Sequence, residues 1–202
     1  MAKWVMQVIY STGYAGIVML MFAENVFPPI PSELIMPLAG YMTADGKFTF
    51  FGVVLAGTIG SVLGSLPLYW AGRGFGEERL KKLADRHGRW VTVSARDIER
   101  AKKWFDKYGG WALLLCRLVP GVRSLISVPA GLGRMNAGLF LLYTAIGMAL
   151  WTTFLASLGY FLRANFGKVE EYLNPISYVV LGGMILFYIY RVITHRGKSS
   201  GM

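Results

Sequence analysis

The fold of this chain is set by the segment Arg117-Leu-Val-Pro120-Gly-Val-Arg123-Ser-Leu-Ile-Ser-Val-Pro129-Ala-Gly131-Leu-Gly133. Apart from its two arginines the segment is apolar enough to enter a bilayer, and prolines and glycines interrupt it repeatedly. A guanidinium at membrane depth costs from about 3 to more than 10 kcal/mol, so its presence indicates a functional site. Irregular backbone at that depth occurs only where protein buries it or where it lines a wet cavity.

An earlier segment has the same character but carries carboxylates in place of guanidiniums. It reads Glu24-Asn-Val-Phe-Pro28-Pro29-Ile-Pro31-Ser-Glu33-Leu-Ile-Met-Pro37-Leu-Ala-Gly40. Each proline removes a backbone donor and constrains the residue before it, so one continuous helix cannot run from Glu24 to Met42. We expect two short half-helices with a break between them. The acidic and basic segments form the pair around which the chain is built.

Four long uncharged runs indicate that the chain belongs in a membrane. They are Trp4–Ala23, Phe48–Gly72, Ala137–Leu162 and Tyr172–Tyr190, with 20, 25, 26 and 19 residues. About 20 helical residues span the hydrocarbon layer of a bilayer. A soluble domain of 202 residues would not carry several such runs. The sequence therefore predicts an all-α integral membrane protein with about four transmembrane helices.

The net charge of +10 is concentrated beside these runs. Residues 73–107 hold eleven Lys and Arg against six Asp and Glu, and three more basic residues lie in the tail 191–202. Basic residues next to membrane spans are retained on the cytoplasmic side. The charge is therefore a topology signal, and we expect no nucleic-acid partner. The single cysteine, Cys116, excludes an intrachain disulfide.

Residues 73–107 are predicted to leave the membrane as a cytoplasmic amphipathic helical segment. Ser94 and Asp97 have the spacing of a capping box that opens a helix. Behind them an apolar face alternates with Lys and Arg on the opposite face, as helical periodicity requires. The apolar residues are Ile98, Ala101, Trp104, Phe105 and Tyr108. This helix lies either on the membrane surface or on the protein itself.

Charge placement also predicts how the two broken segments lie. If both crossed the membrane, three crossings would separate the basic loop from the basic tail and place them on opposite faces. If both segments instead enter the membrane and return to the same side, two crossings separate the basic loop from the basic tail. The loop and the tail are then both cytoplasmic. We therefore predict two opposed re-entrant helical hairpins, the first entering from outside and the second from inside. Both chain termini would then be cytoplasmic.

A weak internal repeat supports this arrangement. Similar residues recur at an offset of 91, at Pro29 and Pro120, Ala39-Gly40 and Ala130-Gly131, Tyr69-Trp70 and Tyr160-Phe161, and Phe75-Gly76 and Phe166-Gly167. Each hairpin-plus-span unit (10–72 and 108–165) would be one copy, in opposite orientations. The remaining parts are the segment 73–107, a last helix over 172–190 and the tail. Inverted repeats with discontinuous helices are a transporter architecture.

Several motifs resemble those of the DedA family, also called the VTT or SNARE-associated domain. They are Glu24 with Pro28-Pro29-Ile-Pro31-Ser32-Glu33, then Tyr69-x-x-Gly72-Arg73, then Arg117-x-x-Pro120-x-x-Arg123 with Pro129-Ala130-Gly131. The likeness covers roughly residues 10–165. Leu118 and Ser32-Glu33 depart from the commonest family pattern, which leaves the subgroup and its substrate open.

The resemblance implies a lipid transporter of the bacterial cytoplasmic membrane. Family members are associated with returning undecaprenyl phosphate across that membrane, or with flipping phospholipids such as phosphatidylethanolamine, and their activity is linked to the proton motive force. They depend on two acidic and two basic membrane-embedded residues. By motif, these are Glu24, Glu33, Arg117 and Arg123 here.

The chemistry of these four residues agrees with that role. A guanidinium fork suits a phosphate, and the break at Pro120-Gly121 would let Arg117 and Arg123 converge on one. Glu24 and Glu33 would carry the proton or compete for the arginines. The alternative is that each arginine forms a permanent ion pair with a carboxylate or caps a broken helix, although buried pairs seldom add net stability.

Other residues are assigned supporting roles. Tyr69 and Arg73 either anchor the cytoplasmic end of the second span or receive a lipid headgroup, and Arg134 anchors the interface. The residues expected to shape the hairpins are Pro28, Pro29, Pro31, Pro37, Gly40, Pro120, Gly121, Pro129 and Gly131.

No metal site, cofactor or catalytic residue is expected. Two alternative functions are a membrane enzyme acting on lipid phosphates and a proton-coupled ion antiporter. The sequence leaves the oligomeric state open, and a homodimer is one option.

Overall fold

The computed structural model describes residues 2–26, 32–43, 46–91, 95–118, 123–124 and 126–161. Regular secondary structure in these ranges is entirely helical. The helices are α1 (Ala2–Thr12), α2 (Tyr14–Val26), α3 (Ser32–Thr43), α4 (Phe50–Val91), α5 (Ala95–Arg117), α6 (Ser127–Leu132) and α7 (Ala137–Phe161). Predictions that lie outside the described residues concern Pro28, Pro29, Pro31, the Ser94 cap, Pro120, Gly121, the helix 172–190 and the tail 191–202.

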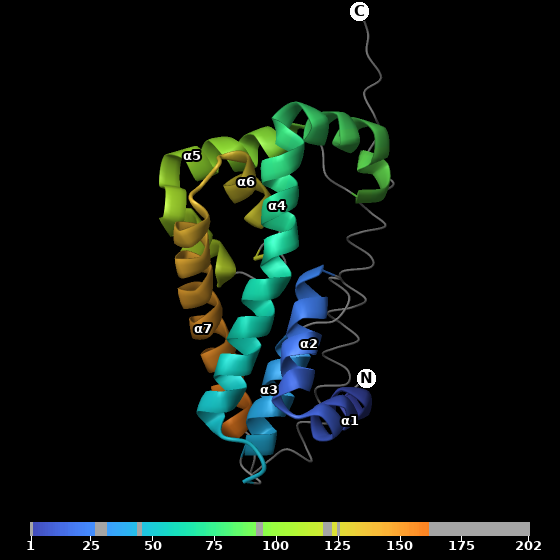
Figure 1. Cartoon of the computed structure of the whole chain (residues 1–202), viewed down its shortest axis with the longest axis vertical. Helices are drawn as coiled ribbons and strands as arrows, with labels where there is room; N and C mark the ends of the chain where they lie inside the picture. The colour runs from blue at the N-terminus through green and yellow to red at the C-terminus, as the bar shows by residue number, and fades with distance from the viewer. Residues whose placement is uncertain are drawn as a thin grey trace, which may run out of the picture.

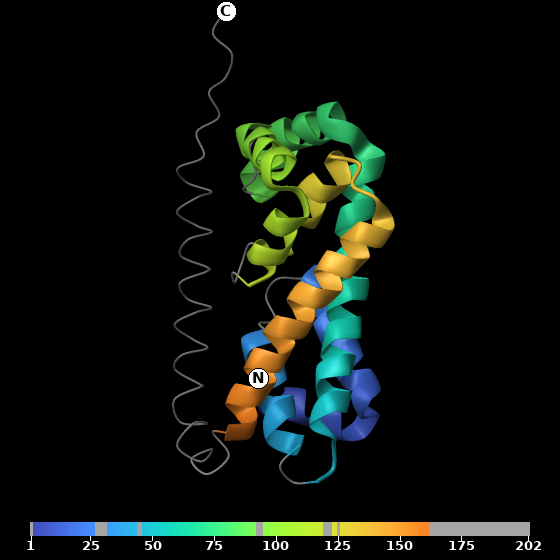
Figure 2. The ribbon, with the colours of Figure 1, turned by 90° about the vertical axis from the view of Figure 1, so that its left-hand side faces the viewer.

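α4 and α7 run along the molecule, and the pairs α2–α3 and α5–α6 lie toward its lower and upper ends (Figure 1). The long helices are α4 and α7, which cross each other obliquely (Figure 2). At the lower end α2 rises to about mid-height and α3 returns. From the upper end α5 descends to a similar level and α6 returns. The two broken segments of the sequence therefore approach each other from opposite ends of the bundle.

Both long helices are suited to a lipid environment. The stretches Phe50–Gly74 and Ala137–Phe161 are each long and apolar enough to cross a membrane. Each also exposes a row of large apolar side chains at helical spacing. On α4 the row is Phe51, Leu55, Ile59 and Leu63, and on α7 it is Leu139, Leu142, Ile146, Leu150 and Phe154. Rows of this length are too apolar for a water-exposed surface.

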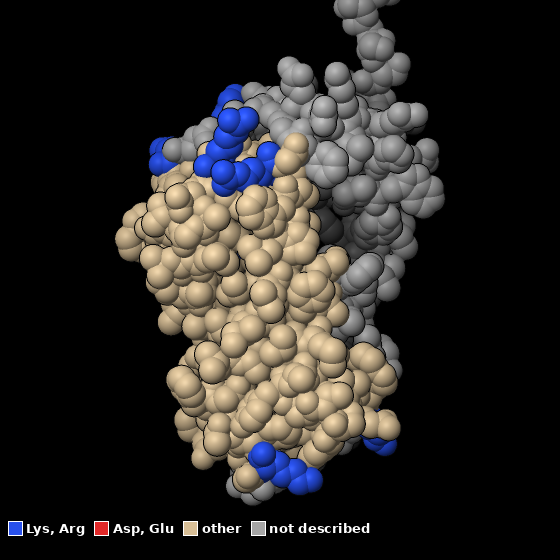
Figure 3. All heavy atoms as spheres, in the orientation of Figure 1, with Lys and Arg blue, Asp and Glu red and all other residues tan. Residues whose placement is uncertain are grey.

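The surface charges agree with a membrane orientation along the long axis. On the face seen in Figure 3, the described Lys and Arg side chains gather at the two ends of the molecule, and the surface between them is uncharged. Such a band matches the hydrocarbon layer of a bilayer, flanked by two polar interfaces.

The predicted first span, Trp4–Ala23, is wrong as a single helix. It is divided at Gly13, whose φ of 65° is a left-handed conformation that ends α1 before α2 begins. Figure 1 shows that α1 turns aside at the lower end of the molecule, where α3 ends and α4 begins. The expectation of a cytoplasmic N-terminus depended on a single helix over this run, which the structure divides into α1 and α2.

The two predicted helix breaks are present, but not every proline causes one. α2 ends at Val26 and a new helix begins at Ser32, while Pro37 lies inside α3. The second segment is likewise divided between α5 and α6. A further bend occurs at Gly109, whose φ and ψ of 52° and −128° are not helical.

The amphipathic segment packs on the protein itself at Phe105. This side chain is 5% exposed and belongs to a cluster with Ile126 and Ala130, while Lys103 and Lys107 are exposed on the same helix. Tyr108, at the bend, is 46% exposed, so the predicted apolar face is only partly covered.

Glycines allow α3 to pack closely on the backbone of α7, and α6 on the backbone of α4. At the seam between α3 and α7, a Cβ added to Gly40 would collide with the Ala156 carbonyl, and one added to Gly159 with that of Pro37. At the seam between α4 and α6, Gly131 abuts the Tyr69 carbonyl in the same manner. Small residues at such positions allow helices in a membrane to approach closely.

We predict that Gly159→Ala lowers the midpoint of thermal unfolding in detergent by several degrees. The added methyl would force α3 away from α7, and overpacking of this kind costs about 1–3 kcal/mol. Gly74→Ala is the matched control, because a Cβ there meets nothing within 4 Å. Equal midpoints for the two variants would show that the seam tolerates separation.

Candidate functional site

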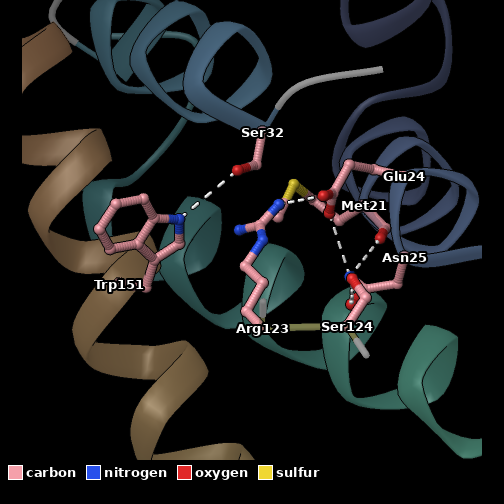
Figure 4. A network of polar contacts seen from close by, with 7 residues as sticks. All are labelled: Met21, Glu24, Asn25, Ser32, Arg123, Ser124 and Trp151. Carbon is pink, nitrogen blue, oxygen red and sulfur yellow. Dashed lines mark hydrogen bonds and ion pairs between the residues drawn. The ribbon is translucent and has the colours of Figure 1, made fainter. Parts of the chain in front are cut away.

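An ion pair joins the two hairpins in the interior of the protein. Arg123 donates from Nη2 to Oε1 of Glu24, the acidic residue near the end of α2 (Figure 4). The two residues are 3% and 6% exposed, so neither charge is solvated by water. Breaking a buried pair by removing one partner is strongly destabilising, since the other charge is left uncompensated. The structure thus brings together two of the four charged residues that the sequence singled out.

A second contact beside the ion pair holds the carboxylate in place. Asn25 donates from Nδ2 to Oε2 of Glu24 (3.1 Å) and to the Met21 carbonyl (3.0 Å). Its Oδ1 lies 3.3 Å from the Ser124 hydroxyl, which donates to it. Across the two hairpins, Glu24 therefore contacts Arg123 and Asn25 contacts Ser124 (Figure 4).

Arg117, at the end of α5, is completely buried and has no carboxylate partner among the described residues. Its Nη2 donates to the Ser127 hydroxyl (2.9 Å) and to the Thr144 hydroxyl (3.2 Å). Its Nε and Nη1 have no hydrogen-bond partner among the residues that the structure describes. Since a guanidinium has five N–H donors, the three on Nε and Nη1 remain unused. Unused donors of a buried charged group are costly.

α7 provides the surface against which Arg117 is held. Gly147 leaves room for the aliphatic part of the side chain, because a Cβ there would lie 2.8 Å from the Cβ of Arg117. The guanidinium lies 5.8 Å from the ring centroid of Phe140, within the range of a cation–π contact. Phe140 in turn stacks on Tyr69, with ring centroids 4.3 Å apart. The orientation of Arg117 is therefore fixed by packing as well as by hydroxyl groups.

Glu33 is close to this site but is not paired. It lies in the first turn of α3, is partly exposed, and makes no hydrogen bond or ion pair within the described part of the chain. Its charge acts on Glu24, as do the charges of Arg123 and Arg117. Arg123, Arg117 and Glu33 thus lie within electrostatic range of Glu24, and in the described part of the chain Glu33 and Arg117 have no ionic partner.

Tyr69 and Arg73 link α4 to the connection between α6 and α7 by hydrogen bonds at the upper end of the bundle. The fully buried Tyr69 donates its hydroxyl hydrogen to the Met135 carbonyl (2.6 Å), and Arg73 Nη1 donates to the Tyr69 hydroxyl (2.7 Å). These bonds join α4 to the connection between α6 and α7. Arg134 is exposed on that connection with a φ of 50°. The contacts of Tyr69 indicate an anchor.

Several residues of the site carried no recognisable signal in the sequence. Asn25, Ser124, Ser127 and Thr144 are polar residues in apolar surroundings, but single polar residues of this kind are common in membrane helices. Only Thr144, in the middle of an uncharged span, could have been suspected. Among the residues that the structure describes, no group of three or more His, Cys, Asp or Glu side chains could hold a metal ion.

Comparison with known proteins identifies the family. The model of the VTT domain matches residues 30–161, well over half of the chain. The chain belongs to the DedA family of VTT-domain membrane proteins. The match includes Glu33 and both arginines, whereas Glu24 precedes it.

Relatives in this family carry two kinds of name. Proteins named undecaprenyl phosphate transporter A are 38% identical in Staphylococcus aureus (98% of this chain and 98% of that protein) and 30% identical in Bacillus subtilis (89% and 88%). A Lactococcus lactis protein that is 40% identical (94% and 89%) is named alkaline phosphatase-like protein. No solved structure matches the chain.

We predict that Thr144→Val lowers the midpoint of thermal unfolding by several degrees. The change keeps the side-chain shape but removes an acceptor from a buried guanidinium, at a cost of about 1–3 kcal/mol. Thr12→Val is the matched control, because the exposed Thr12 hydroxyl bonds only to the backbone of its own helix. If the two variants unfold alike, Thr144 does not hold Arg117.

Proposed function

We propose that this protein moves a phosphate-bearing lipid, undecaprenyl phosphate in preference to a phospholipid, between the leaflets of the bacterial cytoplasmic membrane. Arg117 and Arg123 hold the phosphate, and Glu24 and Glu33 couple the movement to protons. The isoprenoid tail stays in the bilayer beside the bundle, so the protein accommodates only the headgroup. The names of the relatives in S. aureus and B. subtilis support this substrate.

The proposal depends on one observation, the unpaired state of Arg117. A buried guanidinium that served only as a structural ion pair would face a carboxylate, but the described acceptors of Arg117 are two hydroxyl groups and three of its N–H donors are unused. Such donors are satisfied when a phosphate arrives, because phosphate oxygens accept charge-assisted hydrogen bonds. The unused donors of this buried guanidinium support a role for Arg117 in binding the phosphate.

Charge balance gives a reason for proton coupling. Two guanidiniums and two carboxylates sum to zero, and a phosphate monoester adds about −1.5 to −2. In a site without water, that excess of negative charge is unfavourable. Protonation of either Glu24 or Glu33 would offset one unit of that excess, and protonation of Glu24 would release Arg123 for the phosphate. Loss of the proton on the other side of the membrane would return Arg123 to Glu24 and expel the lipid.

The arrangement of helices fits an alternating-access mechanism. The hairpins α2–α3 and α5–α6 act as re-entrant elements that open the site to one face at a time. The contacts have the two-fold correspondence expected of an inverted repeat, since α2 packs on α4 and α5 on α7, while α3 packs on α7 and α6 on α4. With α1 at the end opposite α6, we place the N-terminus outside and the C-terminus in the cytoplasm.

The name of the L. lactis relative makes a lipid phosphatase the second candidate. A phosphatase would release inorganic phosphate from a polyprenyl phosphate, whereas a transporter would leave the phosphate ester intact. Purified protein in detergent, incubated with farnesyl phosphate and assayed for free phosphate, separates the two. We expect no release above the level of a protein-free sample.

We predict that Arg117→Ala and Arg123→Ala each lower transport about 30-fold or more in proteoliposomes containing undecaprenyl phosphate. Loss of a buried charged donor costs about 2–5 kcal/mol. Headgroup accessibility in the outer leaflet measures the rate. Arg117→Lys, which keeps the charge without the fork, should retain part of the activity. Lys107→Ala, at an exposed position, is the control. Full transport by either alanine variant would contradict the proposal.

We predict that Glu24→Gln and Glu33→Gln remove the dependence of transport on pH while binding of the lipid phosphate survives. A glutamine cannot exchange a proton, but it retains similar size and polarity. Transport rates from pH 6 to 8, with and without an imposed proton gradient, provide the measurement. Glu33→Asp should keep a pH-dependent rate. Unchanged pH dependence in both glutamine variants would count against proton coupling by these residues.

A further inference from the structure

Arg123 has a donor that its partner Glu24 does not use. Nη2 bonds to Glu24, whereas the buried Nη1 has no hydrogen-bond partner within the described ranges of the chain. In Figure 4 the guanidinium nitrogen that is not bonded to Glu24 extends toward the side on which Ser32 and Trp151 lie. An empty donor on a guanidinium that is only 3% exposed indicates that an acceptor binds there in another state.

Ser32 and Trp151 contribute two more donors on this side of Arg123. Trp151, on α7, donates from Nε1 to the hydroxyl of Ser32 at 3.5 Å, which is the outer limit of a hydrogen bond. Ser32 is fully buried, and its hydroxyl donates to no group in the described part of the chain. Both the indole N–H and the hydroxyl can therefore turn to a stronger acceptor.

The backbone supplies further donors at the same place. Ser32 is the first residue of α3, a helix of 12 residues. The first N–H groups of a helix have no partner within it and concentrate positive potential, a combination that favours phosphate. Glu33 lies in the same turn. The start of α3 thus unites an anion-binding backbone with the group that the proposed mechanism protonates.

We propose that Ser32, Trp151 and the start of α3 form, with Arg123, the seat of the lipid phosphate, and that the seat selects a terminal phosphate monoester. A monoester offers three terminal oxygens as acceptors. A phosphodiester such as that of phosphatidylethanolamine offers one fewer, so it would leave one donor of the seat empty. This inference rests on the proposed function and adds to it two binding residues and a physical basis for the preference for a monoester.

The test uses purified full-length protein in detergent and measures dissociation constants for four probes. The probes are farnesyl phosphate, farnesol, inorganic phosphate and dihexanoyl phosphatidylethanolamine. We expect Ser32→Ala and Trp151→Phe each to weaken binding of farnesyl phosphate about 10-fold and to leave farnesol unchanged. Ser11→Ala and Trp111→Phe, at exposed positions on α1 and α5, are the matched controls. The intact protein should bind the monoester at least about 10-fold more tightly than the diester.

The outcomes separate this inference from the proposed function. If Arg123→Ala loses farnesyl phosphate while Ser32→Ala and Trp151→Phe bind it normally, the seat lies elsewhere and the inference is overturned. The same holds if the diester binds as tightly as the monoester. If the intact protein binds farnesyl phosphate no better than farnesol, the proposed function itself fails. Binding of inorganic phosphate equal to that of farnesyl phosphate would identify a small-anion site and overturn the lipid assignment.

Discussion

Two guanidiniums inside a membrane protein require acceptors and protection from lipid, and the architecture meets both needs. Arg123 obtains its acceptor from Glu24 on the opposite hairpin, and Arg117 obtains two hydroxyls, one from α6 and one from α7. The first arrangement requires the two hairpins to end near each other, and the second requires the α5–α6 hairpin to pack on α7. The breaks in both segments, the glycine seams and the obliquely crossed long helices can all be understood as consequences of that requirement.

The two arginines are equivalent in the motif but not in the structure. Arg123 has an exchangeable partner, since a carboxylate can release a guanidinium when it takes up a proton. Arg117 has neutral partners whose affinity for it does not depend on protonation. This difference suggests a division of work in which Arg117 is always ready for an anion and Arg123 becomes ready only after Glu24 gives way. A site with two paired arginines would be too stable to bind substrate readily.

Much of the fold could be predicted from the sequence because its signals are local. The two long spans follow from uncharged runs, and the broken segments follow from clustered prolines. The first span was wrong because nothing in the run Trp4–Ala23 distinguishes a left-handed glycine at position 13 from one that merely packs. The charged residues of the site carried a signal because charge is rare at membrane depth. Asn25 and Trp151 carried none, and Ser32 was noted only as part of a motif, since their roles depend on contacts between residues far apart in the chain.

The packing of α3 against α7 has a consequence for biogenesis. As the chain emerges from the ribosome, α2 finds its partner α4 soon after it is made, but α3 must wait for α7, more than ninety residues later. Until then α3, with Glu33 in its first turn, has only its smaller contacts with α1, α2 and α4. The insertion machinery must therefore shelter the α2–α3 hairpin until α7 is made. A ribosome that stalls after α4 would leave this hairpin incompletely packed, as a substrate for membrane quality control.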